Sequence, residues 1–292
     1  MNDSKLFAFG FGYSADALAR RLGADWRVAA TCRTQDRRAE LAARNIDAHI
    51  FDGSTAVANA TGVLAGTTHL LSSIPAEDAG DPVLACHGDD IARLTTLKWV
   101  GYLSTTGVYG DRDGGWVDEE SVLRPTGERG RRRVAAEAGW LDLWHRHGVP
   151  VHVFRLAGIY GPGRSAFDSL RSGRAQRIDK PGQVFSRIHV EDIAAVLVAS
   201  MARPNPGAIY NVCDDDPAPP AAVIEYAARL LGMAPPPLVP FDQAKLSDMA
   251  RSFYADNKRV KNERIKRELG VTLAYPSYRE GLADILTREI SR

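Results

Sequence analysis

A glycine-rich segment near the amino terminus has the residue types needed to hold a phosphate group. Residues 7–15 place Gly10, Gly12 and Ala15 in a Gly-x-Gly-x-x-Ala pattern, with Tyr13 and Ser14 between the last two. Between a strand and a helix, the first glycine permits a tight turn, the second lets the backbone approach a pyrophosphate, and the alanine allows close packing. Free N–H groups at the helix start can then bind the anion. The pattern favours a dinucleotide site over an ordinary glycine-rich turn.

The residues after the second apolar run bear on which dinucleotide would bind. About 20 residues beyond the glycines, domains that select NAD carry an acid for the ribose 2′-hydroxyl. This chain has Thr31-Cys-Arg33-Thr34 there, and the Arg33 guanidinium can pair with a 2′-phosphate. We therefore expect NADP and give NAD second place, the alternative being that Arg33 is a solvated surface arginine. Asp52-Gly53 follows the third apolar run, where Asp52 can bind an adenine amino group or simply form a turn.

The composition favours a small-molecule partner. Lys and Arg number 37 against 36 Asp and Glu, so no global field selects nucleic acid or an anionic membrane. The three cysteines are far apart, which argues against a disulfide framework or a Cys-x-x-Cys site and fits a reducing cytoplasm. No signal-peptide pattern and no apolar run of membrane-spanning length is present. We expect a cytoplasmic protein that binds neither nucleic acid nor membrane.

Short apolar runs alternate with stretches of helical period, which is typical of strand-helix units in a parallel sheet. The predicted strands are Leu6–Phe9, Arg27–Thr31, Ala48–Phe51, His69–Ser72, Trp99–Leu103, Val151–Arg155 and Ile209–Val212. The predicted helices between them are Ala15–Leu22, Arg37–Arg44, Pro82–Leu97 and Glu128–His147. This order predicts an α/β fold, a Rossmann-type doubly wound parallel sheet.

The rhythm changes after residue 156, where Gly158, Gly161, Pro162 and Gly163 form a cluster of turn residues. We predict that residues 1–156 form an NAD(P)-binding domain and that residues 188–213 return to it. Residues 157–187 and 214–292 are predicted to form a smaller carboxyl-terminal substrate lobe.

Four later motifs carry a resemblance to a known family. They are Tyr-Leu-Ser-Thr-Thr-Gly-Val-Tyr-Gly-Asp at 102–111, Arg-Leu-Ala-Gly-Ile-Tyr-Gly-Pro-Gly at 155–163, Arg-Ile-His-Val-Glu-Asp-Ile-Ala at 187–194 and Tyr-Asn-Val at 210–212. Together they resemble the extended short-chain dehydrogenase/reductases, the family of NAD-dependent epimerases and dehydratases that act on nucleoside-diphosphate sugars. The resemblance covers nearly the whole chain, but a shared fold does not fix function.

The resemblance implies roles for residues at the ends of the strands. A Ser or Thr four residues before the Val-Tyr-Gly tyrosine binds the reacting oxygen in that family, which corresponds to Thr105, whereas Tyr109 would be structural. A threonine that only bonds the backbone is an equal alternative for Thr105. Leu156 begins a segment that resembles the one backing the nicotinamide. The expected cofactor site also includes Ser72, Ser73 and Ser104, and Thr106 is placed with the substrate.

The family's catalytic Tyr-x-x-x-Lys pair is missing from its expected place. Counted back from Glu137, the two positions hold Arg129 and Arg133. A guanidinium has no acceptor atom and a pKa above about 12, so neither arginine can replace the tyrosine as a proton donor. Tyr254 and Lys258 match the spacing, but about 120 residues too late, just before a basic stretch at 258–269 that we predict to be helical.

The arginines have another possible use, which is to bind an anionic substrate. Arg129 and Arg133 are four residues apart and share a helix face, although a solvated basic face is an equally simple interpretation. Arg187 is the stronger candidate, because family members carry a substrate-phosphate arginine two residues earlier, where this chain has Phe185. Arg164 lies near the entrance of the predicted lobe. No metal motif is present, so we expect no metal site.

Two functions fit these observations. The first is an NADP-dependent oxidoreductase of the epimerase/dehydratase type, which acts on a nucleotide-sugar-like or other anionic carbonyl or hydroxyl compound, with Thr105 and Arg133 at the reacting centre. The second is a non-catalytic NADP-binding redox sensor or interaction protein. The helices at 82–97 and 128–147 also resemble those that form dimer interfaces in the family, so a homodimer is possible.

Overall fold

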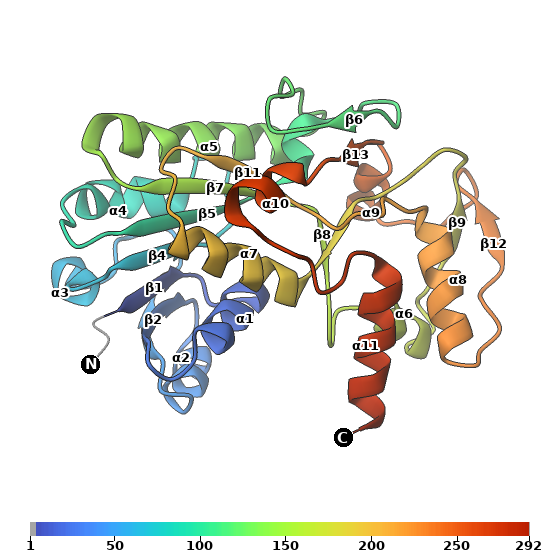
Figure 1. The fold of residues 1–292 in the computed structure, drawn as a ribbon, viewed down its shortest axis with the longest axis horizontal. Helices are drawn as coiled ribbons and strands as arrows, with labels where there is room; N and C mark the ends of the chain where they lie inside the picture. The colour runs from blue at the N-terminus through green and yellow to red at the C-terminus, as the bar shows by residue number, and fades with distance from the viewer. Residues whose placement is uncertain (1–3, 292) are drawn as a thin grey trace.

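The computed structural model describes residues 4–291, and its largest element is a parallel sheet of seven strands in the order β11-β7-β5-β4-β1-β2-β3 (Figure 1). The strands are β1 (Lys5–Phe9), β2 (Arg27–Cys32), β3 (Asp47–Ile50), β4 (His69–Ser72), β5 (Trp99–Thr105), β7 (Val151–Leu156) and β11 (Ile209–Val212). The order reverses between β1 and β4, and ligands of such sheets bind at this switch point, beyond the carboxyl ends of the strands. The predicted Rossmann-type α/β fold is confirmed.

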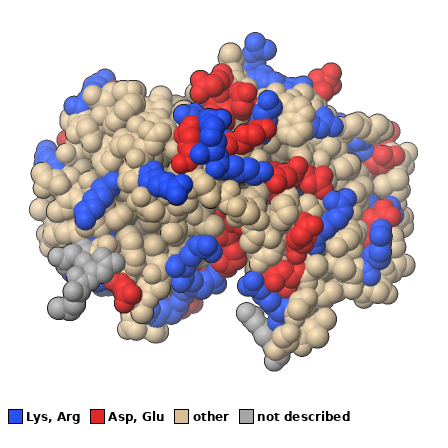
Figure 2. All heavy atoms as spheres, in the orientation of Figure 1, with Lys and Arg blue, Asp and Glu red and all other residues tan. Residues whose placement is uncertain are grey.

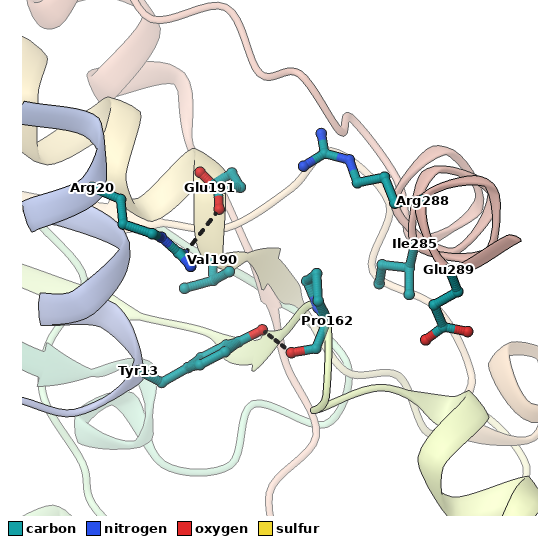
Figure 3. A pocket seen from close by; sticks show the side chains of 8 residues that line it. All are labelled: Tyr13, Arg20, Pro162, Val190, Glu191, Ile285, Arg288 and Glu289. Carbon is teal, nitrogen blue, oxygen red and sulfur yellow. Dashed lines mark hydrogen bonds and ion pairs between the residues drawn. The ribbon is translucent and has the colours of Figure 1, made fainter. Parts of the chain in front are cut away.

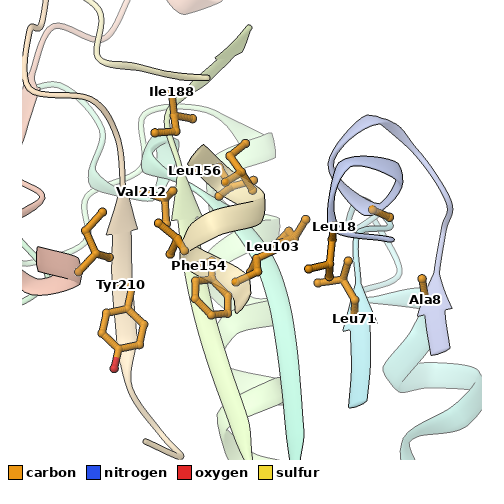
Figure 4. Packing of buried hydrophobic residues seen from close by; sticks show 14 of the residues in the cluster. Ala8, Leu18, Leu71, Leu103, Phe154, Leu156, Ile188, Tyr210 and Val212 are labelled. Atoms are coloured by element: carbon orange, nitrogen blue, oxygen red, sulfur yellow. The ribbon is translucent and has the colours of Figure 1, made fainter. Parts of the chain in front are cut away.

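Helices cover both faces of the sheet, which is why the strands are apolar on both sides. α1 (Tyr13–Leu22), α2 (Gln35–Ala42) and α7 (Val190–Ala202) lie on one face, while α3 (Ala60–Leu64), α4 (Pro82–Ala92) and α5 (Glu128–His147) lie on the other (Figure 1). Leu18, Leu71, Leu103 and Phe154 belong to the core of the α1 and α7 face (Figure 4). The alternation of side chains along each strand therefore builds two cores from one sheet.

A smaller region extends from the carboxyl edge of the sheet. Its strands form the parallel pairs β8 (Gly158–Tyr160) with β10 (Arg187–His189), and β9 (Arg177–Asp179) with β12 (Leu238–Pro240). Its helices are α6 (Ala166–Arg171), α8 (Pro220–Leu230), α9 (Asp248–Phe253) and α11 (Tyr278–Ile290). Tyr160, Phe167, Leu282 and Ile285 belong to its separate core.

The carboxyl-terminal residues divide between the two regions. α10 (Glu263–Leu269) packs on β11 and α7, and Ile265 and Leu269 belong to the core of the main sheet, although the sequence placed 214–292 in the lobe. The predicted helix at 258–269 is wrong in its first residues. Arg259–Val260 instead forms β13, which pairs with β6 (Trp116–Val117) because the chain crosses there to the loop after β5.

Other helix boundaries also differ from the prediction: α1 begins two residues earlier, at Tyr13, and α2 ends at Ala42 instead of Arg44. The helix predicted at Pro82–Leu97 ends at Ala92, where Arg93 caps it, and Thr96 Oγ1 donates to the Thr67 carbonyl at 2.6 Å as the chain turns toward β5. α2 begins two residues earlier than predicted, because Thr34 caps it by accepting a hydrogen bond from the Arg37 N–H. Within residues 4–291, no helix has the length and apolarity that a membrane span requires.

Candidate functional site

Gly10 shapes the turn that leads from β1 into α1. Its φ is +81°, and a Cβ at this position would lie 3.0 Å from both Ser73 Oγ and Ile74 Cγ1, so a side chain is excluded by conformation and by space. The Gly10 N–H donates to Thr31 Oγ1 at 2.8 Å, and Ser73 Oγ donates to the Gly10 carbonyl at 2.9 Å. Neighbouring strands β2 and β4 thus hold the turn in one shape.

Gly12 caps the amino end of α1 in a different way. Gly12 is the N-cap residue, its backbone is extended, it has no side chain that could cap the helix, and a Cβ built on it would meet nothing within 4 Å. The first N–H groups of α1 have no acceptor within the helix and none from a capping side chain, as an anion site requires. Behind them, Ser14 is 7% exposed and Ala15 is fully buried, which lets the helix lie close to the sheet. The loop fits the pyrophosphate of a dinucleotide.

Tyr13 joins this loop to the smaller region. Its hydroxyl donates to the Pro162 carbonyl at 3.0 Å, and the Arg164 guanidinium lies 5.9 Å from its ring centre. Burial raises the pKa of Tyr13 to about 12, so the phenol stays protonated. Tyr13 also lines a pocket of about 120 Å³ between α1 and α11, where Arg20 pairs with Glu191 at 3.2 Å (Figure 3). Tyr13 therefore connects the glycine-rich loop to the smaller region through its hydrogen bond to Pro162.

Two arginines lie beyond the carboxyl end of β2. Arg33 is exposed, and within residues 4–291 its side chain has no hydrogen-bond or ion-pair partner. Arg37, which the sequence reasoning missed, places Nη2 3.4 Å from the Phe11 carbonyl and pairs through Nη1 with Glu40 at 2.8 Å. It therefore approaches the glycine loop from the side where the adenosine ribose of a dinucleotide lies in this fold. Its position four residues after Arg33, on the first turn of α2, was the available signal.

The expected adenine and β4 residues have local partners. Asp52 Oδ1 accepts hydrogen bonds from the N–H and the hydroxyl of Ser54, both at 2.8 Å, and these bonds lower the pKa of Asp52. Gly53 has a φ of +95° and continues the same turn. Ser72 is fully buried, and its hydroxyl oxygen has no partner among the described residues. The contacts of Asp52 are thus those of a turn residue.

Thr105 and Ser104 point in different directions at the end of β5. Thr105 Oγ1 accepts a hydrogen bond from the Gly107 N–H at 3.1 Å and so caps η1 (Thr106–Tyr109), which leaves its own O–H free to donate. Ser104 Oγ donates to Glu137 Oε1 at 2.5 Å and is 5% exposed. The side chain of Thr105, and not that of Ser104, is available to a ligand. Thr106 is partly exposed beside it.

A buried polar network supports this strand end from beneath. Glu137 on α5 accepts a two-pronged contact from Arg155 on β7, with Nη2 to Oε2 at 2.8 Å and Nε to Oε1 at 3.1 Å. Arg155 Nη1 donates to the Tyr109 hydroxyl at 2.9 Å, which donates to Asn211 Oδ1 at 2.7 Å. The network fixes β5, β7 and β11 in register just below Thr105 and Leu156, which pair across the sheet.

The two arginines in the place of Tyr-x-x-x-Lys point to different partners. Arg129 is exposed and lies 5.8 Å from the ring centre of Phe253. Arg133 donates through Nη1 to the Tyr102 hydroxyl at 2.9 Å and to the Leu103 carbonyl at 2.8 Å. They do not form a common anion site, because Arg133 is committed to β5.

Tyr254 and Lys258 do not act as a pair either. The Tyr254 ring is 8% exposed and packs between Phe185 and Phe241, with ring centres 5.2 Å away on each side. Lys258 pairs with Asp256 at 2.9 Å. Tyr254 and Lys258 match the Tyr-x-x-x-Lys spacing, but their side chains serve the packing of the smaller region.

Arg187 lies on β10, where β10 pairs with the strand that follows Leu156. Its Nη1 donates to the carbonyls of Phe185 at 2.8 Å and Ala218 at 3.1 Å, and burial lowers the pKa of its guanidinium. The structure thus brings Thr105, Leu156 and Arg187 to the same edge of the sheet as the glycine loop. Arg129 and Arg164 lie at the surface around it. No group of three potential metal ligands occurs within residues 4–291.

Comparisons with known proteins agree with this geometry. A model of the NAD dependent epimerase/dehydratase family matches residues 90–213. Protein YeeZ of Escherichia coli K12 is 28% identical over 290 residues, which cover 93% of this chain and 96% of that protein. A functionally unknown conserved protein from Silicibacter pomeroyi has a solved structure with 54% identity and a TM-score of 0.89, covering 98% of this chain and 99% of that one.

A more distant structure shares the fold. UDP-glucuronic acid 4-epimerase from Bacillus cereus, solved with UDP-glucuronic acid and NAD, has a TM-score of 0.78 at 14% identity and covers 98% of this chain and 99% of its own. The chain belongs to the NAD-dependent epimerase/dehydratase family, as its motifs predicted.

Proposed function

We propose that this protein is an NADP-dependent oxidoreductase that acts on a small anionic carbonyl or hydroxyl compound. The observation that carries the proposal is the uncapped amino end of α1, with open space above Gly12. Gly10, Gly12 and the α1 N–H groups would hold the pyrophosphate. Arg33 and Arg37 would hold the 2′-phosphate, with Asp52 near the adenine. NADP, when bound, supplies or accepts a hydride.

The remaining residues determine what the substrate oxygen meets. Thr105 keeps its O–H free because its oxygen already accepts from the Gly107 N–H, so it can donate to a carbonyl or alkoxide oxygen. Such a bond stabilises developing negative charge without transferring a proton. The proton that completes reduction would come from water, since Arg129 cannot release one near neutral pH. Oxidation of ordinary sugar alcohols and reduction of ordinary ketones should then be slow, because general acid-base assistance usually contributes about 10² to 10⁴ in rate.

The second candidate is an NADP-binding sensor without turnover. Arg129 and Arg133 in the catalytic positions favour it, because Arg133 is used to brace β5. Both candidates share the cofactor site and differ only in chemistry. We place the protein in the cytoplasm because its three scattered cysteines fit a reducing compartment, and we propose a homodimer through α4 and α5 on the family resemblance alone.

A substrate panel followed by NADPH absorbance separates the two candidates. We expect turnover of an anionic carbonyl compound that falls at least tenfold in Thr105→Ala and returns in Thr105→Ser, which restores the hydroxyl. Tyr254→Phe is the matched control and should change the rate less than twofold. Turnover that disappears only in Tyr254→Phe would place the active site elsewhere. Tight NADPH binding without turnover on any substrate would favour the sensor.

A further inference from the structure

Arg187 and Asp214 are a basic and an acidic residue that lie next to each other without a hydrogen bond between their side chains. The Asp214 N–H donates to the Arg187 carbonyl at 2.7 Å, so the two backbones are adjacent. Asp214 is 1% exposed, and neither of its carboxylate oxygens has a side-chain partner or a well-formed hydrogen bond among the described residues, although the backbone N–H groups of Arg187 and Asp216 face it. A buried carboxyl normally has partners for its oxygens, so its condition needs an explanation.

The Arg187 guanidinium also has hydrogen-bond donors without an acceptor among the described residues. Only Nη1 donates, to the Phe185 and Ala218 carbonyls, and within residues 4–291 no acceptor meets Nε or Nη2. These two nitrogens form the edge of a guanidinium that binds a carboxylate or phosphate through two parallel hydrogen bonds. Carbonyl contacts at Nη1 hold the side chain in place and leave that edge for a ligand.

The groups around the pair are almost all neutral and stay so. The groups that face Asp214 besides Arg187 are Tyr160, Cys213 and Asp216, and those that face Arg187 also include Tyr254 and Tyr278. Burial raises the pKa of Tyr160, Cys213, Tyr254 and Tyr278, so these four remain protonated near neutral pH. Arg187 is therefore the main positive charge available to an anion here.

We propose that Arg187 and Asp214 form a proton-linked oxyanion subsite, in which Arg187 binds one carboxylate or phosphate group of the substrate while Asp214 takes up a proton. The inference rests on the proposed function, because this subsite would hold the anionic group of its substrate. Burial raises the pKa of Asp214 to about 8, so the carboxyl is near its titration point and responds to a neighbouring charge. An incoming anion favours the protonated form. By reciprocity, ionised Asp214 competes for Arg187 and lowers its affinity for the anion.

The linkage has a measurable size. When one proton is taken up with the anion, affinity falls about tenfold for each pH unit above the pKa of the free carboxyl. Sulfate is a suitable probe because its charge does not change between pH 7 and pH 9, and acetate tests the carboxylate alternative. Sodium chloride at matched ionic strength gives the baseline for general salt effects.

The test measures thermal unfolding of the full chain with each salt at pH 7 and pH 9. We expect sulfate or acetate to raise the Tm of the parent more at pH 7 than at pH 9. Asp214→Asn should bind equally at both pH values, since its amide does not titrate. Arg187→Met should show only the general stabilisation that sulfate gives by exclusion from protein surfaces, equal at both pH values and smaller than in the parent at pH 7. The more effective anion identifies the class of substrate group. No rise above chloride in the parent, or an unchanged pH dependence in Asp214→Asn, overturns the proposal.

Calorimetry gives a second readout that needs no variant. Titration of the parent with the effective anion at pH 8.5, in two buffers of different ionisation enthalpy, should show uptake of about one proton or somewhat less. Uptake near zero contradicts the proposal even if Asp214→Asn fails to fold. NADPH titration of the same sample tests the proposed function separately, because the glycine loop and Arg187 are distinct parts of the molecule.

Discussion

Gly10 and Gly12 lie in the same loop, but the lack of a side chain matters at each position for a different reason. At Gly10 the neighbours are already in contact distance, with Ser73 and Ile74 3.0 Å from the place of a Cβ. At Gly12 the corresponding space is open. The first glycine is required by the protein itself, and the second is required only by something that the protein binds.

This difference predicts opposite results for two substitutions. Gly12→Val should reduce dinucleotide affinity at least a hundredfold and change the Tm little, because its side chain would occupy the pyrophosphate position without a clash in the protein. Gly10→Ala should lower stability by about 1–3 kcal/mol, through its positive φ and the tight contacts. Calorimetry with NADPH and thermal unfolding measure both. Normal NADPH binding in Gly12→Val would mean that the cofactor lies elsewhere.

The choice between NADP and NAD also belongs to single residues. Arg33 and Arg37 should each contribute to the preference, because a guanidinium bond to a 2′-phosphate is worth roughly 1.5–3 kcal/mol, or about one to two decades in affinity. We expect NADPH to bind more tightly than NADH and the preference to fall in Arg33→Ala and Arg37→Ala. Arg93→Ala, on the exposed end of α4, is the control. Equal affinities of the parent for both dinucleotides would refute the assignment.

Sequence patterns predict candidate site residues only where local spacing carries the information. Gly10, Gly12 and Arg33 are set by their distance from a strand end, so they could be named without a structure. Arg37 had only a weak signal, its position four residues after Arg33, because its approach to the Phe11 carbonyl depends on which side of α2 faces the loop. Asp214 gave no signal, since an acidic run after a strand usually lies in solvent and its burial arises from the packing of β8, β10 and α11.

At the scale of elements, α5 combines structural and site roles. Its inner face provides Glu137 to the network with Arg155, and its second turn places Arg133 against β5. The sequence predicted the bounds of α5 correctly because its caps and periodicity are local. It could not show that Arg133 would donate to the Tyr102 hydroxyl, because that contact depends on how far α5 lies from β5.

Substitution of one member of the Glu137–Arg155 ion pair tests how much this pair stabilises the packing of α5 on the sheet. Both side chains are buried, so removing one leaves an uncompensated charge, and Arg155→Met should destabilise the protein by about 3–5 kcal/mol. The matched control is Arg146→Met, which breaks the exposed pair with Asp142 on the same helix and should change stability by less than about 0.5 kcal/mol. Urea unfolding measures both. A small effect in Arg155→Met would show that the network is not needed to hold β5, β7 and α5 together.

At the scale of the whole molecule, the surface gives little indication of function and the interior gives more. Lys and Arg are interspersed with Asp and Glu over the visible face, without a large patch of one sign (Figure 2). This agrees with the near-balance of charges in the sequence and with a small-molecule partner. The unusual charges are buried, and they lie both in the sheet and where the smaller region meets it.

Buried titratable groups of two kinds should shape the stability of the whole chain against pH. Burial lowers the pKa of His69, His152 and His189 to about 4. In the unfolded chain these imidazoles titrate near 6.5, so between about pH 6.5 and pH 4 the unfolded state binds more protons. The three histidines therefore make the protein less stable as the pH falls through this range.

Asp214 acts in the opposite direction and at higher pH. With its pKa raised to about 8 from 3.8, the native state keeps a proton that the unfolded chain releases. Its contribution is most favourable at acid pH and is lost progressively as the pH rises to about 8, above which it changes no further. We expect Asp214→Asn to be more stable than the parent at pH 8, by about 1–3 kcal/mol, and to lose this advantage at pH 5. The parent-minus-variant difference cancels the histidines and the other buried carboxyls, Asp81, Glu119 and Asp192, whose pKa burial also raises. Urea unfolding of both proteins at pH 5, 6.5, 8 and 9 measures it, and a difference that stays constant across this range would show that Asp214 is ionised in the native protein throughout.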